Sequence, residues 1–364
     1  MGNCAHVILE RRQRRIRFVT GLSTAGLLLF NAGAALADDE VAFNHRGNLL
    51  ISDQFNNRVI EINPSGDIIW QFGIGPTDVS AKSIVGVNDA QRVGSATLMA
   101  GTGAPAGFEP ACPNGCADNR VLLVSRHGRI VWQYGQFGVT GAGPNELNTP
   151  VQNTWTPEQT VLITDQGNQR IIEVNLHNEI LWQYGTTGVS GNGPNQLNNP
   201  NAAELLQNGH ILISDENNNR AIEVTRDGKI VATFTAGGTV SGVAFASRLT
   251  NGHTLITDSN NSRIVEVDAN DQPVWEYLTN TDKLSNQAPL PTRAIRTRDG
   301  NTIISDQFNQ RVIVVNKAGV IVTQYGNLNT VGFGTQNTSQ GLNGPYDAKR
   351  IGDYTGLTPP EFDD

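Results

Sequence analysis

Long apolar stretches are nearly absent from this chain of 364 residues, which also holds only three Cys and six His and has few charged residues (16%). Beyond the N-terminal segment no run is apolar enough to span a bilayer, and no long run shows the 3.6-residue apolar period of an amphipathic helix. The sequence therefore excludes a helical protein. Its 39 Gly instead favour an all-β protein with many turns.

Residues 1–37 differ from the rest of the chain. Five Arg precede an apolar run from Phe18 to Phe30, and small residues end the segment at Ala37, which is the layout of a cleaved secretory signal. We expect cleavage after Ala37 and a periplasmic or secreted protein. An Arg pair leaves the twin-arginine route open beside the general secretory route. A retained anchor is the alternative, but the apolar run is short for crossing a bilayer.

A surplus of basic residues is lacking. The segment 1–37 carries five Arg and one Glu, a net charge of +4, so its removal takes the formal charge from −8 to −12. An acidic surface repels phosphate, which argues against nucleic acid as a partner.

Cysteine is too scarce for a structural zinc site made of thiolates. Cys112 and Cys116 are the two that remain after residue 37, and they lie in an insertion that we place at Thr102 to Asp118. No His or acidic cluster is close enough to complete a metal site. We therefore predict a disulfide between them, as expected for an oxidising compartment.

A repeated unit fills most of the chain. Each copy has a β-branched run ending in Asp, a polar turn, an Arg that opens a second run, another turn and a third run ending in an aromatic residue, which predicts strand, turn, strand, turn, strand. A further short strand precedes most copies. The recurring Asp residues are Asp53, Asp165, Asp215, Asp258 and Asp306, and the recurring Arg residues are Arg58, Arg120, Arg170, Arg220, Arg263 and Arg311.

These Arg residues lie 43 to 62 residues apart, a period typical of propellers and solenoids. Because four-stranded sheets must pack face to face to bury both faces, we predict a six-bladed β-propeller of antiparallel blades over residues 38–356. Residues 357–364 form a C-terminal tail. We expect the segment from Gly344 to Gly352 to close the ring as the inner strand of the first blade, with Glu40 to Phe43 as the competing segment.

Histidine is missing from one face of the predicted ring. The turns between the second and third strands lie on the same face as the long connectors between blades, and the five His residues after residue 37 fall in turns of the opposite face. Long loops on a rigid scaffold favour binding. A His-bound zinc or a His general base at the loop-rich face would lack its residue.

The recurring Asp and Arg have two interpretations. An Asp before a turn accepts hydrogen bonds from turn amides, and an Arg five residues later is placed to pair with it. Their occurrence in nearly every blade favours a structural role. Alternatively, the Arg ring lines a mouth for an anionic ligand.

The candidate ligand-binding residues are non-repeated residues near the inner strands. Trp132 and its equivalents occupy a repeated position of the outermost strand, and we expect them to pack between blades. Calcium held by channel acids such as Asp89 and Asp347 is an alternative with too few oxygen ligands, and no cofactor is predicted. The candidate ligand-binding residues are Gln152, Trp155, Arg293, Asp347 and Arg350.

The connector Gly-x-Gly-Pro-Asn-x-Leu-Asn-x-Pro, followed by Asp-x-x-Asn-x-Arg and Gly-x-Ile-x-Trp-x-Tyr-Gly, resembles the NHL-repeat family of six-bladed propellers. The resemblance implies partner or ligand binding in many members and chemistry in a few. The motif Asn-Gly-His-x-Leu-Ile-x-Asp also resembles bacterial arylsulfotransferase propellers. Their sulfuryl transfer uses a central His, and no matching His is found at the channel face here.

We therefore expect an exported monomer that binds a small molecule or a protein partner on its loop-rich face. The alternative is an enzyme at the channel mouth, such as a transferase, lyase or lactonase, with Arg293, Asp347 and Arg350 as its candidates.

Overall fold

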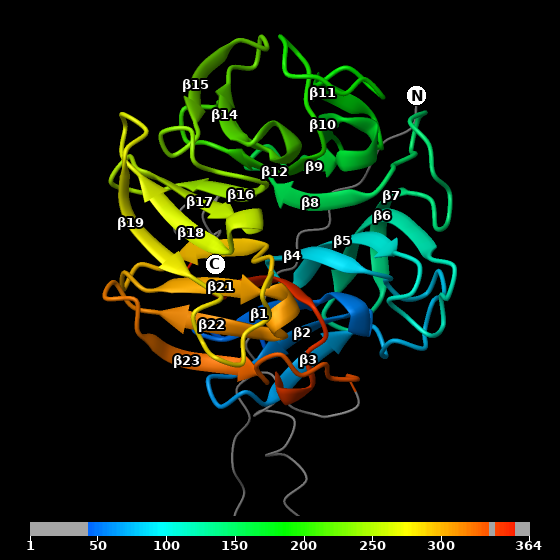
Figure 1. The fold of residues 1–364 in the computed structure, drawn as a ribbon. Helices are drawn as coiled ribbons and strands as arrows, with labels where there is room; N and C mark the ends of the chain where they lie inside the picture. Colours follow the sequence, from blue (N-terminus) through cyan, green and yellow to red (C-terminus); the bar gives the residue numbers. More distant parts are fainter. Residues whose placement is uncertain (1–42, 335–338, 354–364) are drawn as a thin grey trace, which may run out of the picture.

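The computed structural model describes residues 43–334 and 339–353, and these form six four-stranded antiparallel sheets around a ring (Figure 1). The predicted six-bladed β-propeller is confirmed. The proposed signal at 1–37 and the tail at 357–364 lie outside the described residues. Over the described ranges the only helical elements are short 3-10 turns.

Blade 1 joins both ends of the described chain. It contains β1 (Leu49–Asp53), β2 (Arg58–Ile62) and β3 (Ile68–Phe72), and its inner strand is β24 (Pro345–Arg350), which pairs antiparallel with β1. The C-terminal segment therefore closes the ring, as predicted.

The other blades follow the chain, each from its inner to its outer strand. Blade 2 has β4 (Val87–Val93), β5 (Ala96–Ala104), β6 (Cys116–Ser125) and β7 (Ile130–Gly135); blade 3 has β8 (Pro150–Trp155), β9 (Val161–Asp165), β10 (Arg170–Val174) and β11 (Ile180–Tyr184); blade 4 has β12 (Pro200–Leu205), β13 (Ile211–Asp215), β14 (Arg220–Val224) and β15 (Ile230–Phe234); blade 5 has β16 (Val243–Arg248), β17 (Thr254–Asp258), β18 (Arg263–Val267) and β19 (Pro273–Leu278); blade 6 has β20 (Arg293–Arg296), β21 (Thr302–Asp306), β22 (Arg311–Val315) and β23 (Ile321–Gly326).

The hydrophobic core lies between the blades. In β1, Leu49 and Ile51 pack against blade 6 and Leu50 packs against blade 2, because successive side chains of a strand point to opposite faces of the sheet. Each of the six pairs of neighbouring blades has its own cluster of this kind. This explains why the β1 residues are all buried instead of alternating with polar ones.

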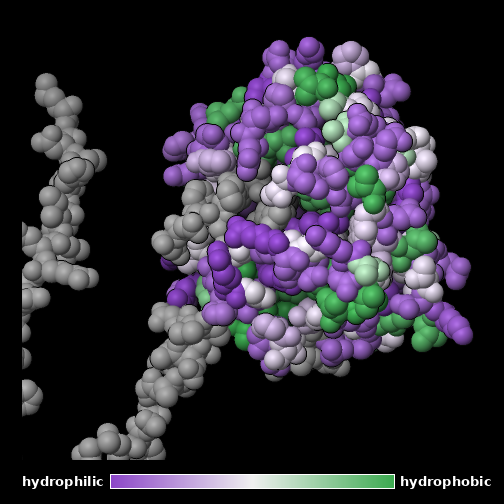
Figure 2. All heavy atoms as spheres, turned by 90° about the vertical axis from the view of Figure 1, so that its left-hand side faces the viewer, coloured by the Kyte–Doolittle hydropathy of each residue, from purple (hydrophilic) through white to green (hydrophobic). Residues whose placement is uncertain are grey.

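Outer-strand tryptophans link neighbouring blades. Trp70 Nε1 donates to the backbone oxygen of Arg126 in blade 2 at 2.8 Å, and Trp182 and Trp275 make the same bond to the next blade. The side of the molecule that Figure 2 shows is mostly hydrophilic, with separate apolar groups.

Candidate functional site

One face of the ring carries both the turns and the connectors. In blades 1 and 3 to 6 a 3-10 turn follows the second strand, and its middle residue donates a backbone hydrogen bond to the connector that precedes the same blade, as Phe55 does to Asn343 at 3.0 Å. These turns are η1 (Gln54–Asn56), η2 (Gln166–Asn168), η3 (Glu216–Asn218), η4 (Ser259–Asn261) and η5 (Gln307–Asn309). The loop-rich face thus has a regular, hydrogen-bonded floor.

An insertion in blade 2 rises above this floor. The ladder between β5 and β6 continues to the pair Ala104 and Cys116, so the insertion is shorter than the predicted Thr102 to Asp118 and covers residues 105–115. Cys112 and Cys116 form a disulfide at its end, as predicted. Because the bond closes a small loop, it restricts the conformations of the insertion.

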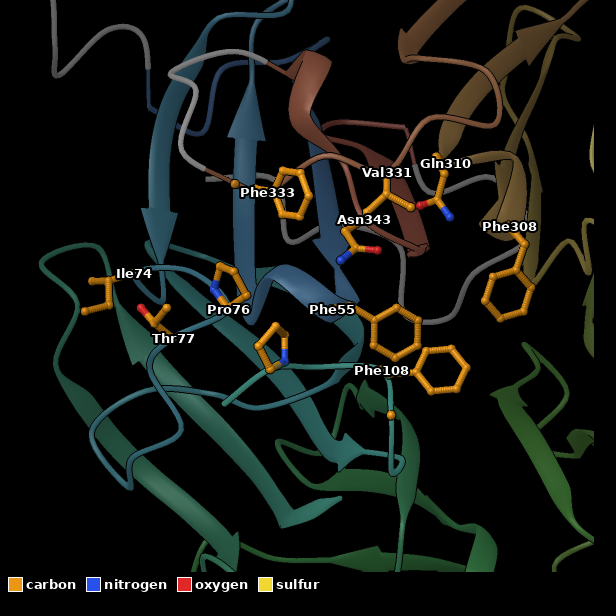
Figure 3. A pocket seen from close by; sticks show the side chains of 13 residues that line it. Phe55, Ile74, Pro76, Thr77, Phe108, Phe308, Gln310, Val331, Phe333 and Asn343 are labelled. Atoms are coloured by element: carbon orange, nitrogen blue, oxygen red, sulfur yellow. The ribbon is translucent and has the colours of Figure 1, made fainter. Parts of the chain in front are cut away.

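A pocket of about 670 Å³ lies between this insertion and blades 1 and 6. Its walls come from the insertion, from the connector after β3, from the turns η1 and η5, and from the connector after β23 (Figure 3). The lining residues are Phe55, Ile74, Pro76, Thr77, Gly107, Phe108, Pro110, Phe308, Gln310, Val331, Phe333, Gly334 and Asn343. We call this site the aromatic pocket.

Three phenylalanines from separate segments meet at one end of the aromatic pocket. The ring of Phe108 lies 4.7 Å from that of Phe55 and 6.3 Å from that of Phe308, measured between centroids. Phe108 and Phe333 are 47% and 68% exposed, and they are grouped with other apolar residues at one concave site, which is the arrangement that indicates binding. The rings therefore offer apolar contact area to a molecule that enters the pocket.

A buried carboxyl group holds the insertion in place. Glu109 is 2% exposed, and its Oε2 accepts a hydrogen bond from Asn57 Nδ2 at 2.7 Å. Burial raises the pKa of Glu109 to about 7, and the bond from Asn57 opposes that rise. The wall that carries Phe108 is thus attached to the turn that carries Phe55.

The predicted ligand-binding residues do not line this pocket. Arg293 and Asp347 come together at the centre of the ring, 3.9 Å apart, and both are fully buried. Gln152 lies between two inner strands, where its side-chain oxygen accepts from Ala203 N at 2.7 Å. Trp155 packs in the core between blades 2 and 3, and Arg350 pairs with Asp299 at 3.1 Å.

The central acids that were considered for calcium surround an ammonium group. Lys349 Nζ lies 2.7 Å from Asp89 Oδ1 and 2.5 Å from Asp347 Oδ2. Burial raises the pKa of Asp89 to about 6, the charge of Lys349 opposes this and that of Asp347 adds to it. The positive charge between these carboxylates is therefore supplied by the protein itself.

Metal ligands elsewhere are sparse. Over residues 43–334 and 339–353, no group of three or more His, Cys, Asp or Glu side chains is arranged to hold a metal ion. His210 and His253 sit in turns after inner strands, where their Nδ1 atoms lie 2.6 and 2.8 Å from Glu223 and Glu266. These histidines belong to local side-chain pairs.

The recurring Asp and Arg form buried ion pairs. In blades 1 and 3 to 6 the Arg Nε lies 2.6–2.8 Å from the Asp Oδ2. In four of these blades, the other Asp oxygen accepts a backbone N–H from the preceding connector, as Asp53 does from Asn343 at 2.8 Å. In blade 2, Arg120 pairs with Asp118 at 2.5 Å instead. In blades 1, 3, 4 and 5 the pair therefore fastens a connector to its own blade.

One feature of the sequence indicates the aromatic pocket, namely the middle residue of the turn after the second strand of each blade. The middle residue of the turn is Phe in blades 1 and 6, and it is Gly167, Asn217 or Asn260 in blades 3, 4 and 5. The position is small or polar in these other blades. The two Phe residues therefore identify the two adjacent blades whose turns line the pocket.

Among the described residues, no helix is long and apolar enough to cross a membrane. No protein-family model matches the chain, and no curated protein matches it significantly.

Solved structures show the same fold. A protein of unknown function from Bacteroides caccae has a TM-score of 0.53 and 14% identity, over 77% of this chain and 93% of that one. Virginiamycin B lyase from Staphylococcus aureus has a TM-score of 0.50 and 14% identity, over 77% and 80%. A catalytically inactive variant of that lyase, with quinupristin, has a TM-score of 0.50 and 13% identity, over 77% of this chain and 84% of that one. At identities this low, the similarity shows a shared fold and does not show a shared activity.

Proposed function

We propose that this chain is an exported NHL-type propeller that binds a small molecule in the aromatic pocket of its loop-rich face. The observation that carries the proposal is the convergence of Phe55, Phe108 and Phe308 from three segments on one concave site. Its volume of about 670 Å³ falls within the roughly 300–1,000 Å³ of small-molecule sites. The disulfide supports an oxidising compartment.

Catalysis at the channel mouth is the second candidate. It would rely on Arg293 and Asp347, which are 1% and 0% exposed. A substrate would have to displace inner-strand packing to reach them. We therefore place the binding function first.

Titration of the purified protein with the neutral fluorophore N-phenyl-1-naphthylamine tests the proposal. We expect saturable binding at one site, and we expect Phe108→Ala to weaken it by about fivefold or more, because a truncated aromatic anchor loses contact area. Phe108 is half exposed, so we expect the variant to retain the fold.

Leu181→Ala is the matched control, because Leu181 is also an exposed apolar residue (56%) but lies on the outer strand β11. It should leave the affinity unchanged. Binding that is absent, or that is equal in the wild type and in Phe108→Ala, would refute the pocket as the binding site. Native mass spectrometry of the same sample would detect a retained compound.

A further inference from the structure

The lining of the aromatic pocket is entirely uncharged. Its 13 residues include no Lys, Arg, Asp, Glu or His, so an ion that entered would lose hydration without gaining an opposite charge. Two side-chain amides, those of Gln310 and Asn343, are the strongest polar groups of the wall. A ligand of this site is therefore expected to be neutral and to meet amide groups at one edge.

Gln310 occupies a repeated position whose side-chain oxygen is already used. The last residue of the turn has a left-handed backbone, and its side-chain amide oxygen accepts the N–H that precedes the next inner strand; Gln310 accepts from Gly344 N at 2.6 Å. The equivalent pairs are Asn57 with Gly86, Asn119 with Thr149, Gln169 with Asn199 and Asn219 with Gly242. This recurrence identifies which terminal atom of the Gln310 amide is the oxygen, and the other terminal atom is therefore the nitrogen.

The nitrogen of Gln310 is left to the pocket. The residue is 7% exposed, and its side chain lines the cavity (Figure 3). No partner for its amide nitrogen is found in residues 43–334 or 339–353. This nitrogen is not among the side-chain atoms that are both enclosed by protein and without a partner, so it is open to the cavity and available to an acceptor on a ligand.

Asn343 lies beside this donor. Its backbone N–H is bound by Asp53 Oδ1 and its backbone oxygen by Phe55 N, which fixes the backbone and leaves the half-buried side-chain amide at the pocket wall. Figure 3 shows Asn343 and Gln310 on the same side of the cavity, with Phe55, Phe108 and Phe308 below them. The two amides thus lie on one side of the site, next to Val331, and face the three Phe rings.

We propose that the aromatic pocket selects a neutral aromatic compound that bears a hydrogen-bond acceptor such as a carbonyl oxygen, with Gln310 as the residue that recognises the acceptor. The flat faces of the ligand would contact the three Phe rings. Anions are disfavoured because no cationic side chain lines the site, and cations because Gln310 presents donors. This inference rests on the proposed binding function and adds the ligand class to it.

Three fluorescent probes test the ligand class. Prodan is neutral and carries a ketone, N-phenyl-1-naphthylamine is neutral without a carbonyl, and 1-anilinonaphthalene-8-sulfonate is an anion. We expect Prodan to bind about fivefold or more tightly than either of the others, which corresponds to one additional hydrogen bond in a desolvated site.

Gln310→Glu is the decisive variant. It retains an oxygen for the N–H of Gly344 and removes the NH₂ donor. We expect Prodan affinity to fall by about fivefold or more, with little change for N-phenyl-1-naphthylamine. Gln169→Glu makes the same exchange at the equivalent position of blade 3, away from the pocket, and should change neither affinity. Thermal unfolding of both variants verifies that the fold is retained.

The outcomes separate the two proposals. If all three probes bind alike and Gln310→Glu has no selective effect, the ligand class is wrong while the binding site stands. If Phe108→Ala weakens none of the probes, the binding function itself fails. If Gln310→Glu does not fold, Gln310→Met replaces it, with the same loss of preference for Prodan expected; an unchanged preference would overturn the role of Gln310.

Discussion

At the residue scale, a few buried polar side chains determine how the loops of this propeller are held. The Asp of each ion pair binds both its Arg and, in most blades, the backbone of a connector. Breaking such a buried pair leaves an uncompensated charge. Glu109 differs from these Asp residues, because its hydrogen-bond partner Asn57 is neutral.

Glu109 makes the stability of the insertion depend on pH. Its pKa is raised from 4.5 to about 7 because the carboxyl group is desolvated. The folded state therefore binds a proton more tightly than the unfolded state, and stability is lost as pH rises from about 4.5 through 7. We expect Glu109→Gln to stabilise the protein at pH 8 by on the order of 1–3 kcal/mol and to have little effect at pH 4.

Urea unfolding of the wild type and Glu109→Gln at both pH values measures this difference. Glu158→Gln is the control, because Glu158 is exposed in a turn and its replacement should matter at neither pH. An equal effect of Glu109→Gln at pH 4 and pH 8 would show that Glu109 does not titrate in this range.

At the element scale, four of the six blades have a close approach between the residue that follows the outer strand and the backbone before the third strand. Gly185 follows β11 with φ of +95°, and a Cβ there would lie 2.3 Å from the backbone oxygen of Gln169. Gly73, Gly135 and Gly326 make the same approach in blades 1, 2 and 6. Both the positive φ and the contact require glycine at this position.

Gly185 and Gly188 lie in the same connector and allow the effect of the positive φ to be measured apart from that of the close contact. Gly188 has φ of +71° and open space around a Cβ, so Gly188→Ala should cost only the backbone strain of about 1–2 kcal/mol. Gly185→Ala adds the clash with Gln169, and we expect it to destabilise by about 1–3 kcal/mol more. Chemical denaturation of the two variants measures the difference, and equal losses would mean that the close contact relaxes freely.

At the scale of the whole molecule, the ring depends on one strand from the far end of the sequence. β24 is the inner strand of blade 1, and its residue Ala348 packs in the core between blades 1 and 6. Without it, β1 becomes an open edge and the central ion pairs of Asp347 and Lys349 are lost.

Truncation tests this closure. Removal of residues 345–364 should abolish the single cooperative unfolding transition and promote association, because blade 1 is left with an unpaired strand. Removal of residues 354–364 alone keeps β24 and should leave the transition unchanged. Calorimetry and size-exclusion chromatography distinguish these results. A cooperative monomer after the longer truncation would show that β24 is dispensable.

The repeat predicts the fold well because it consists of local features. Asp53 and Arg58 stand on the two strands that flank one turn, and their spacing recurs because each blade solves the same packing problem with the same residues. The inner strand from Pro345 to Arg350 was also recognisable, since it resembles the first strand of other blades.

The aromatic pocket was not predicted, because it has no counterpart in the repeat. Selecting non-repeated residues on inner strands led to Arg293 and Asp347, which the fold buries at the centre. Phe108 lies in an insertion without a period, and its contact with Phe55 and Phe308 is visible only when blades 1, 2 and 6 are adjacent.

The sequence by itself determined the strands, the turns and the number of blades, since these follow from patterns of β-branched, glycine and amide residues within about 50 positions. Only the tertiary structure decided which end of the chain completes blade 1, which polar groups pair at the centre and which loops enclose the aromatic pocket. Those outcomes depend on distances between segments far apart in the chain, and ring closure sets these distances.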